Sequence, residues 1–169
     1  MKNKKKLYII YLFVVSTLLS QNAWYQGNLK GINDLSFELN VKGVKDDVWE
    51  KRIKSYVKLK LLEHDIQLLD ALIPRMVIDI NIIDSRVEEV SSFLVQLSIY
   101  GYSISEQEYY KSFSDSNITK NLMTTKIFSY EVMGQTVSEK LYKDIEKNID
   151  YSISLFLNNW YNDNPTKQF

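Results

Sequence analysis

The chain has 169 residues, a length that suits one domain, and its 21 lysines and arginines balance 21 aspartates and glutamates. This balance leaves no basic surplus of the kind that nucleic-acid binding needs. The sequence holds no cysteine, which excludes disulfides, thiol catalysis and thiolate metal sites. It also excludes the cysteine to which the lipid of a bacterial lipoprotein is attached.

The start of the chain has the layout of a secretory signal peptide. Four lysines lie in the first six residues, an apolar run follows at 7–19, and Ser20 and Ala23 are small residues suited to cleavage. The apolar run is shorter than the roughly 20 residues that a membrane-spanning helix needs. We therefore predict a signal peptide over 1–23 and a single periplasmic or secreted domain over 24–169. An uncleaved leader that anchors the protein in the membrane is the alternative.

A strand and a helix open the domain. Leu35–Val41 alternates apolar and polar residues, which is typical of a half-buried strand. Asp47 stands three residues before Glu50, the spacing of a capping box, and predicts a helix over 47–63. His64 follows at the helix end, where its imidazolium would interact favourably with the helix dipole. The inward side chains of this helix recur at steps of three and four: Trp49, Ile53, Tyr56, Val57 and Leu61.

Two central strands form the best-defined part of the predicted sheet. In Met76–Ile82 the even-numbered residues are apolar, and in Phe93–Tyr100 the odd-numbered ones are. This period of two predicts strands with one buried face. A turn beginning at Asp84-Ser85-Arg86 separates them. The short apolar segment 66–69 before them is either extended or one more helical turn.

The segment Tyr102–Phe113 allows two interpretations. It either prolongs the preceding strand into a long hairpin arm, or forms a short helix in which Ser105 and Glu108 make the cap. We favour the arm. A turn at 114–117 follows in either case.

A fourth strand and a second long helix complete the domain. Leu122–Val132 is rich in residues that favour extended structure, and we expect Gly134 to end the strand. Thr136 and Glu139 have capping-box spacing and predict a last helix that continues to Tyr161. Its buried stripe consists of Leu141, Ile145, Ile149, Ile153, Phe156 and Trp160.

This order of elements, β-α-β-β-β-α, predicts the α+β class. The first strand–helix–strand unit should make a parallel pair, and the later strands should pair as antiparallel hairpins. The expected architecture is a two-layer domain with a mixed four-stranded sheet covered on one face by two helices.

Few residues suggest catalysis, and we expect neither an enzyme nor a cofactor. His64 is the only histidine, so a histidine metal site has no partners of its own type, and no nucleophile or acid can be assigned to it. The carboxylates Asp79 and Asp84 are the only candidates for paired acid–base work, but a solvated sheet face explains them more simply. The sequence contains neither a glycine-rich phosphate loop nor a calcium loop of EF-hand spacing.

Aromatic residues are concentrated between positions 100 and 130. On an exposed arm they would form an apolar patch of the kind that marks an interaction site, and tyrosine suits interfaces because its ring is apolar and its tip polar. The alternative is that they rim the core and shield the arm. The candidate partner-binding residues are Tyr100, Tyr102, Tyr109, Tyr110, Phe113, Phe128 and Tyr130.

The whole arrangement resembles small periplasmic α+β domains, namely the amino-terminal domain of TolB and the LptE-like or ABC-transport auxiliary proteins. The similarity is carried by the leader, by Leu29–Ile32 before the first strand, by the helix that ends near 62–66, and by the closing helix with Phe156 and Trp160. It is a resemblance of architecture and implies a non-catalytic domain that serves an assembly of the cell envelope.

Two functions are therefore expected. The preferred one is an exported binding or scaffold module that docks an envelope protein through the aromatic arm or an open sheet edge. Membrane contact would then come only from an uncleaved leader or from the partner. The alternative is a carrier of a small molecule or lipid, with a pocket between helices and sheet lined by Trp49, Phe93, Phe156 and Trp160.

Overall fold

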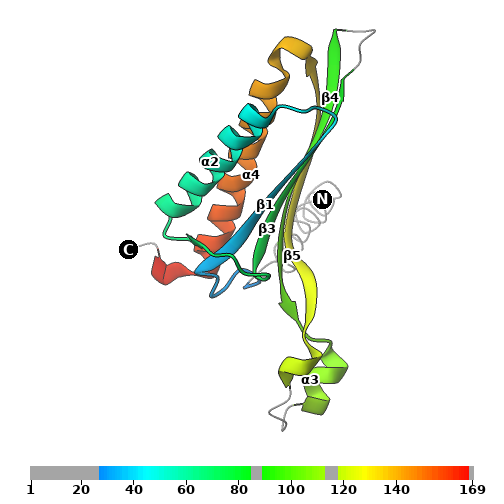
Figure 1. The fold of residues 1–169 in the computed structure, drawn as a ribbon. Helices are drawn as coiled ribbons and strands as arrows, with labels where there is room; N and C mark the ends of the chain where they lie inside the picture. The colour runs from blue at the N-terminus through cyan, green and yellow to red at the C-terminus, as the bar shows by residue number, and fades with distance from the viewer. Residues whose placement is uncertain (1–26, 85–88, 113–117, 168–169) are drawn as a thin grey trace, which may run out of the picture.

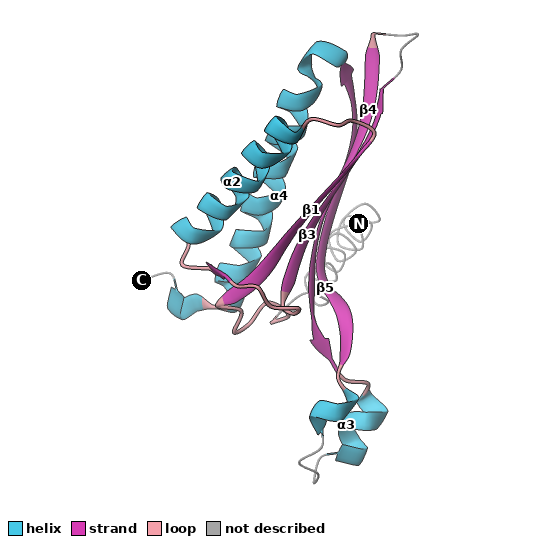
Figure 2. Ribbon diagram, in the orientation of Figure 1, coloured by secondary structure: helices cyan, strands magenta, loops and turns pink. Residues whose placement is uncertain are grey.

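The computed structural model describes residues 27–84, 89–112 and 118–167, so the predicted signal peptide and the turn at Ser85-Arg86 lie outside the described residues. Figures 1 and 2 show a sheet with two long helices on one of its faces. The elements are β1 (Asp34–Lys42), α2 (Asp47–Glu63), β2 (Gln67–Leu68), β3 (Arg75–Asp84), β4 (Val90–Ser103), α3 (Glu106–Ser112), β5 (Met123–Val137) and α4 (Leu141–Asp163).

The sheet has the strand order β2-β1-β3-β4-β5, with β1 parallel to β2 and β3 and the remaining pairs antiparallel. The predicted α+β class, mixed sheet and two covering helices are confirmed. The sheet has five strands where four were predicted. The additional strand, β2, has two residues, whose partners in β1 are Asp34 and Leu35. A strand this short leaves no period in the sequence.

The core lies between the sheet and the two helices. Ile78 and Ile80 of β3 pair with Leu97 and Val95 of β4, and all four side chains are fully buried. The alternation that predicted these strands therefore identified their inward faces correctly. The helices contribute stripes at the predicted spacing, with Trp49, Ile53, Val57 and Leu61 from α2 and Leu141, Ile145, Ile149, Ile153, Phe156, Leu157 and Trp160 from α4.

The start of α2 differs by one residue from the prediction. Asp46, not Asp47, is the N-cap, and its side chain accepts a hydrogen bond of 2.9 Å from the backbone N–H of Trp49. Asp47 is the first helical residue, where its charge faces the positive end of the helix dipole. Because neighbouring aspartates both satisfy the cap preference, the sequence pattern alone did not separate them.

The fourth predicted strand is longer than expected, because β5 passes through Gly134 and continues to Val137. Gly134 lies opposite Phe93, and the aromatic ring occupies the space that a side chain at Gly134 would need. The capping box expected at Thr136 does not form either, since Thr136 belongs to β5 and its hydroxyl donates to the carboxylate of Asp144. The helix α4 starts through a 3-10 turn at Ser138–Lys140 instead.

The end of α4 holds the segment that leads into β1. The Trp160 indole N–H donates to the backbone carbonyl of Ile32 at 2.7 Å, and this hydrogen bond is buried. The Asp163 carboxylate accepts the backbone N–H groups of Gly27 and Leu29 at 2.8 and 2.9 Å. The first and last described parts of the chain therefore meet at the same end of the domain.

Candidate functional site

The β4–β5 hairpin extends beyond the rest of the sheet. Arg75, the first residue of β3, pairs with Tyr100, but the β4–β5 ladder continues for three more pairs, to Ser103 opposite Met123. The helix α3 and a 3-10 turn at Ile118–Asn121 lie beyond this ladder. We name residues 101–125 the arm. Figure 1 shows that the arm projects away from the sheet and from both covering helices.

The tip of the arm is helical, so the favoured interpretation of Tyr102–Phe113 as a continuous strand is wrong and its alternative is right. The strand β4 ends at Ser103, and α3 covers Glu106–Ser112. The backbone N–H of Glu108 donates to the hydroxyl of Ser105 at 3.3 Å, in the capping position that the sequence pattern indicated. This local hydrogen bond favours a helical turn where the ribbon no longer has a third strand beside it.

The predicted aromatic residues divide between the two faces of the sheet. Phe128 and Tyr130 pair with Ile99 and Leu97, whose side chains face the helices. Phe128 is buried and contacts the ring of Phe156 edge-on at 5.9 Å, so it belongs to the core. Tyr130 is half-buried and lies 5.7 Å from the ring of Tyr151 on α4.

Tyr100 and Tyr102 point to the face of the sheet opposite the helices, because they alternate with inward residues of β4. The Tyr100 ring lies between two cations, the Arg75 guanidinium at 5.6 Å and the Lys126 ammonium at 6.0 Å from its centroid. Such cation–π contacts fix the ring at the root of the arm. Tyr102 is the next residue outward on that face and is exposed.

The exposed part of the arm includes residues that the sequence pattern did not indicate. Tyr102 and Tyr110 have exposed fractions of 56% and 68%, and Leu122, just before β5, and Met123, its first residue, are exposed by 40% and 52%. Leu122 and Met123 belong to the start of the predicted fourth strand. They are exposed because the β4–β5 hairpin extends past the first residue of β3. Phe113 and the side chain of Tyr109 lie outside the described residues.

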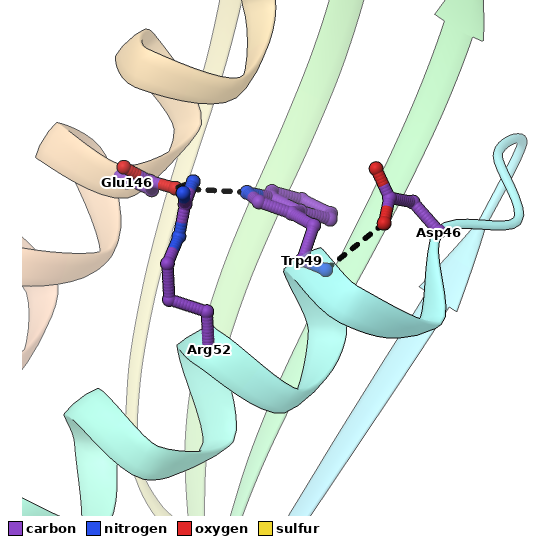
Figure 3. Close-up of polar contacts among 4 residues, drawn as sticks. All are labelled: Asp46, Trp49, Arg52 and Glu146. Atoms are coloured by element: carbon purple, nitrogen blue, oxygen red, sulfur yellow. Dashed lines mark hydrogen bonds and ion pairs between the residues drawn. The ribbon is translucent and has the colours of Figure 1, made fainter.

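A polar cluster lies between α2 and α4 and was not predicted. Figure 3 shows Arg52 and the Trp49 indole meeting at the carboxylate of Glu146. The indole N–H donates to Glu146 Oε1 at 2.9 Å, and Arg52 forms an ion pair with the same oxygen. One turn further along both helices, the Tyr56 hydroxyl donates to the Asp150 carboxylate. The spacing of these residues was visible in the sequence. Arg52 and Tyr56 are four positions apart on α2, and Glu146 and Asp150 are four positions apart on α4, so each pair lies on one face of its helix.

The environment of Tyr56 keeps its hydroxyl protonated. Partial burial raises the pKa of Tyr56 above its usual value, and the hydrogen bond with Asp150 and the negative charges of Asp150 and Glu63 act in the same direction. Tyr56 is therefore a neutral donor to Asp150 over a wide range of pH.

The residues considered for other functions have structural roles. Trp49, Phe93, Phe156 and Trp160, expected to line a carrier pocket, are all buried in the packed core. Asp79 lies on the open face of the sheet and accepts a hydrogen bond of 3.1 Å from the Asn40 amide, while the Asp84 side chain lies outside the description. His64 caps the end of α2, and its Nδ1 lies 2.7 Å from the Tyr161 hydroxyl.

The described part of the chain has neither a candidate metal site nor a candidate membrane-spanning helix. Residues 27–84, 89–112 and 118–167 contain no group of three or more histidine, aspartate or glutamate side chains placed to hold a metal ion. In the same ranges, every helix is too short or too polar to pass through a lipid bilayer.

Comparison with known proteins adds little. No family model matches the chain, and no curated protein matches it significantly. Among solved structures, a minor lipoprotein from Acinetobacter baumannii is similar over 82% of this chain and 88% of that one, with 16% sequence identity and a TM-score of 0.23. An identity and a TM-score this low show neither a family nor a function. The resemblance to TolB and LptE-like domains therefore stays a prediction.

Proposed function

We propose that this protein is an exported, non-enzymatic binding module of the bacterial cell envelope, and that it docks a protein partner through the arm. The observation that carries the proposal is the extension of β4 and β5 past β3, which separates the arm from the core. None of the described side chains of the arm belongs to the buried apolar cluster. The apolar side chains of the arm are thus not explained by the stability of the domain.

The chemistry of the arm suits a protein partner. Tyr102, Tyr110 and Met123 are exposed, and tyrosine and methionine are enriched at protein interfaces. A tyrosine contributes a large apolar ring while its hydroxyl still makes hydrogen bonds to water or to a partner. The cation–π contacts of Arg75 and Lys126 with the Tyr100 ring hold the base of the arm against the sheet. This restraint reduces the conformational entropy that the arm would lose when it binds a partner.

The location in the envelope rests on the sequence. The basic, apolar and small-residue segments over 1–23 follow the order of a secretory leader. Exported proteins are often stabilised by disulfides, which a chain without cysteine cannot form. Its stability must therefore come from its core, which is the continuous apolar cluster between sheet and helices.

A sheet edge offers a second docking mode. Among the described residues β5 is an edge strand, and its 15 residues carry only two charged side chains, Lys126 and Glu131. Long edge strands with few charges are templates for strand addition by another chain. A partner strand beside β5 would continue directly from the arm, so both modes can belong to one interface.

A photo-cross-linking residue at Tyr110 in the living cell tests the proposal. We expect one dominant protein product, which is lost when Tyr102 is replaced with serine in the same chain. A cross-linker at Tyr151 on α4 is the control, because Tyr151 is also an exposed tyrosine, at 56% against 68% for Tyr110, but lies in the helix layer and not on the arm. The same product from both positions, or a product that survives Tyr102→Ser with unchanged yield, would contradict docking through the arm.

A further inference from the structure

An open groove of about 290 Å³ lies between α2 and α4. Its lining residues are Arg52, Ile53, Tyr56, Glu146, Ile149 and Asp150. Ile53 and Ile149 are buried and form an apolar floor, while the charged and hydroxyl groups form the walls. The groove therefore combines an apolar base with a polar rim.

The two carboxylates of the rim, Glu146 and Asp150, differ in how their negative charge is compensated. Glu146 has a cationic partner, Arg52, and the Trp49 indole N–H besides. Asp150 receives a hydrogen bond from the neutral hydroxyl of Tyr56. Within the described residues the ion pairs are Arg52–Glu146 and Arg75–Glu38, so Asp150 forms no direct ion pair there. The charged residues that line the groove, Arg52, Glu146 and Asp150, together carry a net charge of −1.

These features define a complementary ligand. A cation is favoured by Asp150, and an alkyl stem is favoured by Ile53 and Ile149. The Tyr56 ring already has a cation of this chain over it, the Lys60 ammonium at 6.0 Å from the ring centroid. The volume lies at the lower limit for small-molecule pockets, and the open mouth buries a single side chain better than a whole drug-sized ligand.

We infer that the groove between α2 and α4 binds a lysine or arginine side chain of a partner protein, with its charge at Asp150 and its stem over Ile53 and Ile149. This second recognition site does not depend on the arm, because it lies in the helix layer and the arm extends from the sheet (Figure 2). Arg52 acts as an internal competitor, since it already neutralises the neighbouring carboxylate.

Two blocked tripeptides test the inference on the full chain: acetyl-Gly-Arg-Gly-amide and the same peptide with citrulline, which has the shape of arginine but no charge. The signal is the NMR resonance of the Trp49 indole N–H, which is bonded to Glu146 beside the groove. We expect saturable binding of the arginine peptide with a Kd of about 1 mM and no saturation with citrulline. Asp150→Asn should raise the Kd about fivefold, and Arg52→Ala should lower it.

Glu131→Gln is the matched control, because it removes one carboxylate charge on the open face of the sheet, where Glu131 bonds to Gln96. Its Kd should equal that of the unchanged protein. Equal shifts with arginine and citrulline would overturn the inference. Weaker binding after Arg52→Ala would also overturn it, because Arg52 would then belong to the ligand's own contacts. Unchanged thermal unfolding of each variant shows that the differences are not due to misfolding.

Discussion

Gly134 of β5 faces the ring of Phe93 of β4 so closely that a Cβ atom on Gly134 would lie 2.6 Å from Phe93 Cζ. On the inner face of the sheet, the Phe93 ring occupies its own place and also the space that a side chain at position 134 would take. This explains why a glycine stands in the middle of a long strand, where it normally lowers strand stability.

Gly134→Ala should therefore destabilise the protein by about 1–3 kcal/mol, the usual cost of overpacking a core. Urea unfolding measures the change. Gln135→Ala, on the next residue and the opposite face, should change stability by less than about 0.5 kcal/mol. The cost should fall in the double variant Phe93→Leu/Gly134→Ala, because the smaller side chain makes room for the methyl group. Additive costs would show that Phe93 is not the cause.

The cap of α2 gives a second prediction, on neighbouring aspartates. Asp46→Ala removes the acceptor of the Trp49 N–H and should cost about 1 kcal/mol of unfolding free energy. Asp47→Ala removes only a favourable charge in the first turn and should cost roughly 0.3 kcal/mol. Thermal or urea unfolding of the two variants distinguishes them. A larger loss at Asp47 would mean that the helix begins one residue later.

Asp163 provides a third prediction, because a carboxylate at the C-terminal end of a helix opposes the helix dipole. Its two hydrogen bonds to Gly27 and Leu29 outweigh this cost. Asp163→Ala should lower stability by about 1–3 kcal/mol and speed hydrogen exchange at the Leu29 amide. Asn162→Ala, at an exposed neighbour, serves as the control and should leave the exchange rate unchanged.

The Tyr56 hydroxyl makes stability depend on pH at the alkaline end. Because the pKa of Tyr56 is raised in the folded state, the unfolded chain releases this proton first as the pH rises past about 10. Stability should then fall with increasing pH, and the fall should be smaller in Tyr56→Phe. Urea unfolding at a series of pH values from 8 to 11 measures both slopes. Identical slopes would show that neither the burial of Tyr56 nor its hydrogen bond to Asp150 raises its pKa in the folded state.

The arm should be separable from the fold. Residues 102–124 can be replaced by Asn-Gly, which makes a tight turn between the paired residues Gly101 and Thr125. We expect cooperative unfolding with stability within about 1 kcal/mol of the full chain, because no described side chain of the removed segment belongs to the core cluster. Loss of cooperative unfolding would show that the arm supports the domain.

The sequence predicted the central strands well because each has one buried face and therefore a clear period of two. The inward residues of β3 and β4 were read directly from that pattern. For β5 the pattern was insufficient, since a register shift at Ile99/Tyr100 changes the alternation beyond it. Only the pairing with β4 shows that Phe128 and Tyr130 face the helices while Tyr102 does not.

The two candidate sites depend on relationships that sequence spacing does not contain. The arm is exposed because β3 begins at Arg75, so the ribbon has no third strand beyond that point. The groove depends on how α2 lies against α4, which brings Tyr56 to Asp150 across 94 positions of sequence. The individual residues were visible, but their meeting is a property of the packing.

The attachment of the Gly27–Ile32 segment to the last turn of α4 also bears on how the protein is made. These hydrogen bonds join residues 128 to 136 positions apart. The segment that is synthesised first therefore cannot form them until the last turn of α4 has been synthesised. Contacts this distant in sequence slow folding, because a long loop must close before they form. A chain still emerging from the ribosome therefore cannot complete this fold until its final helix is released.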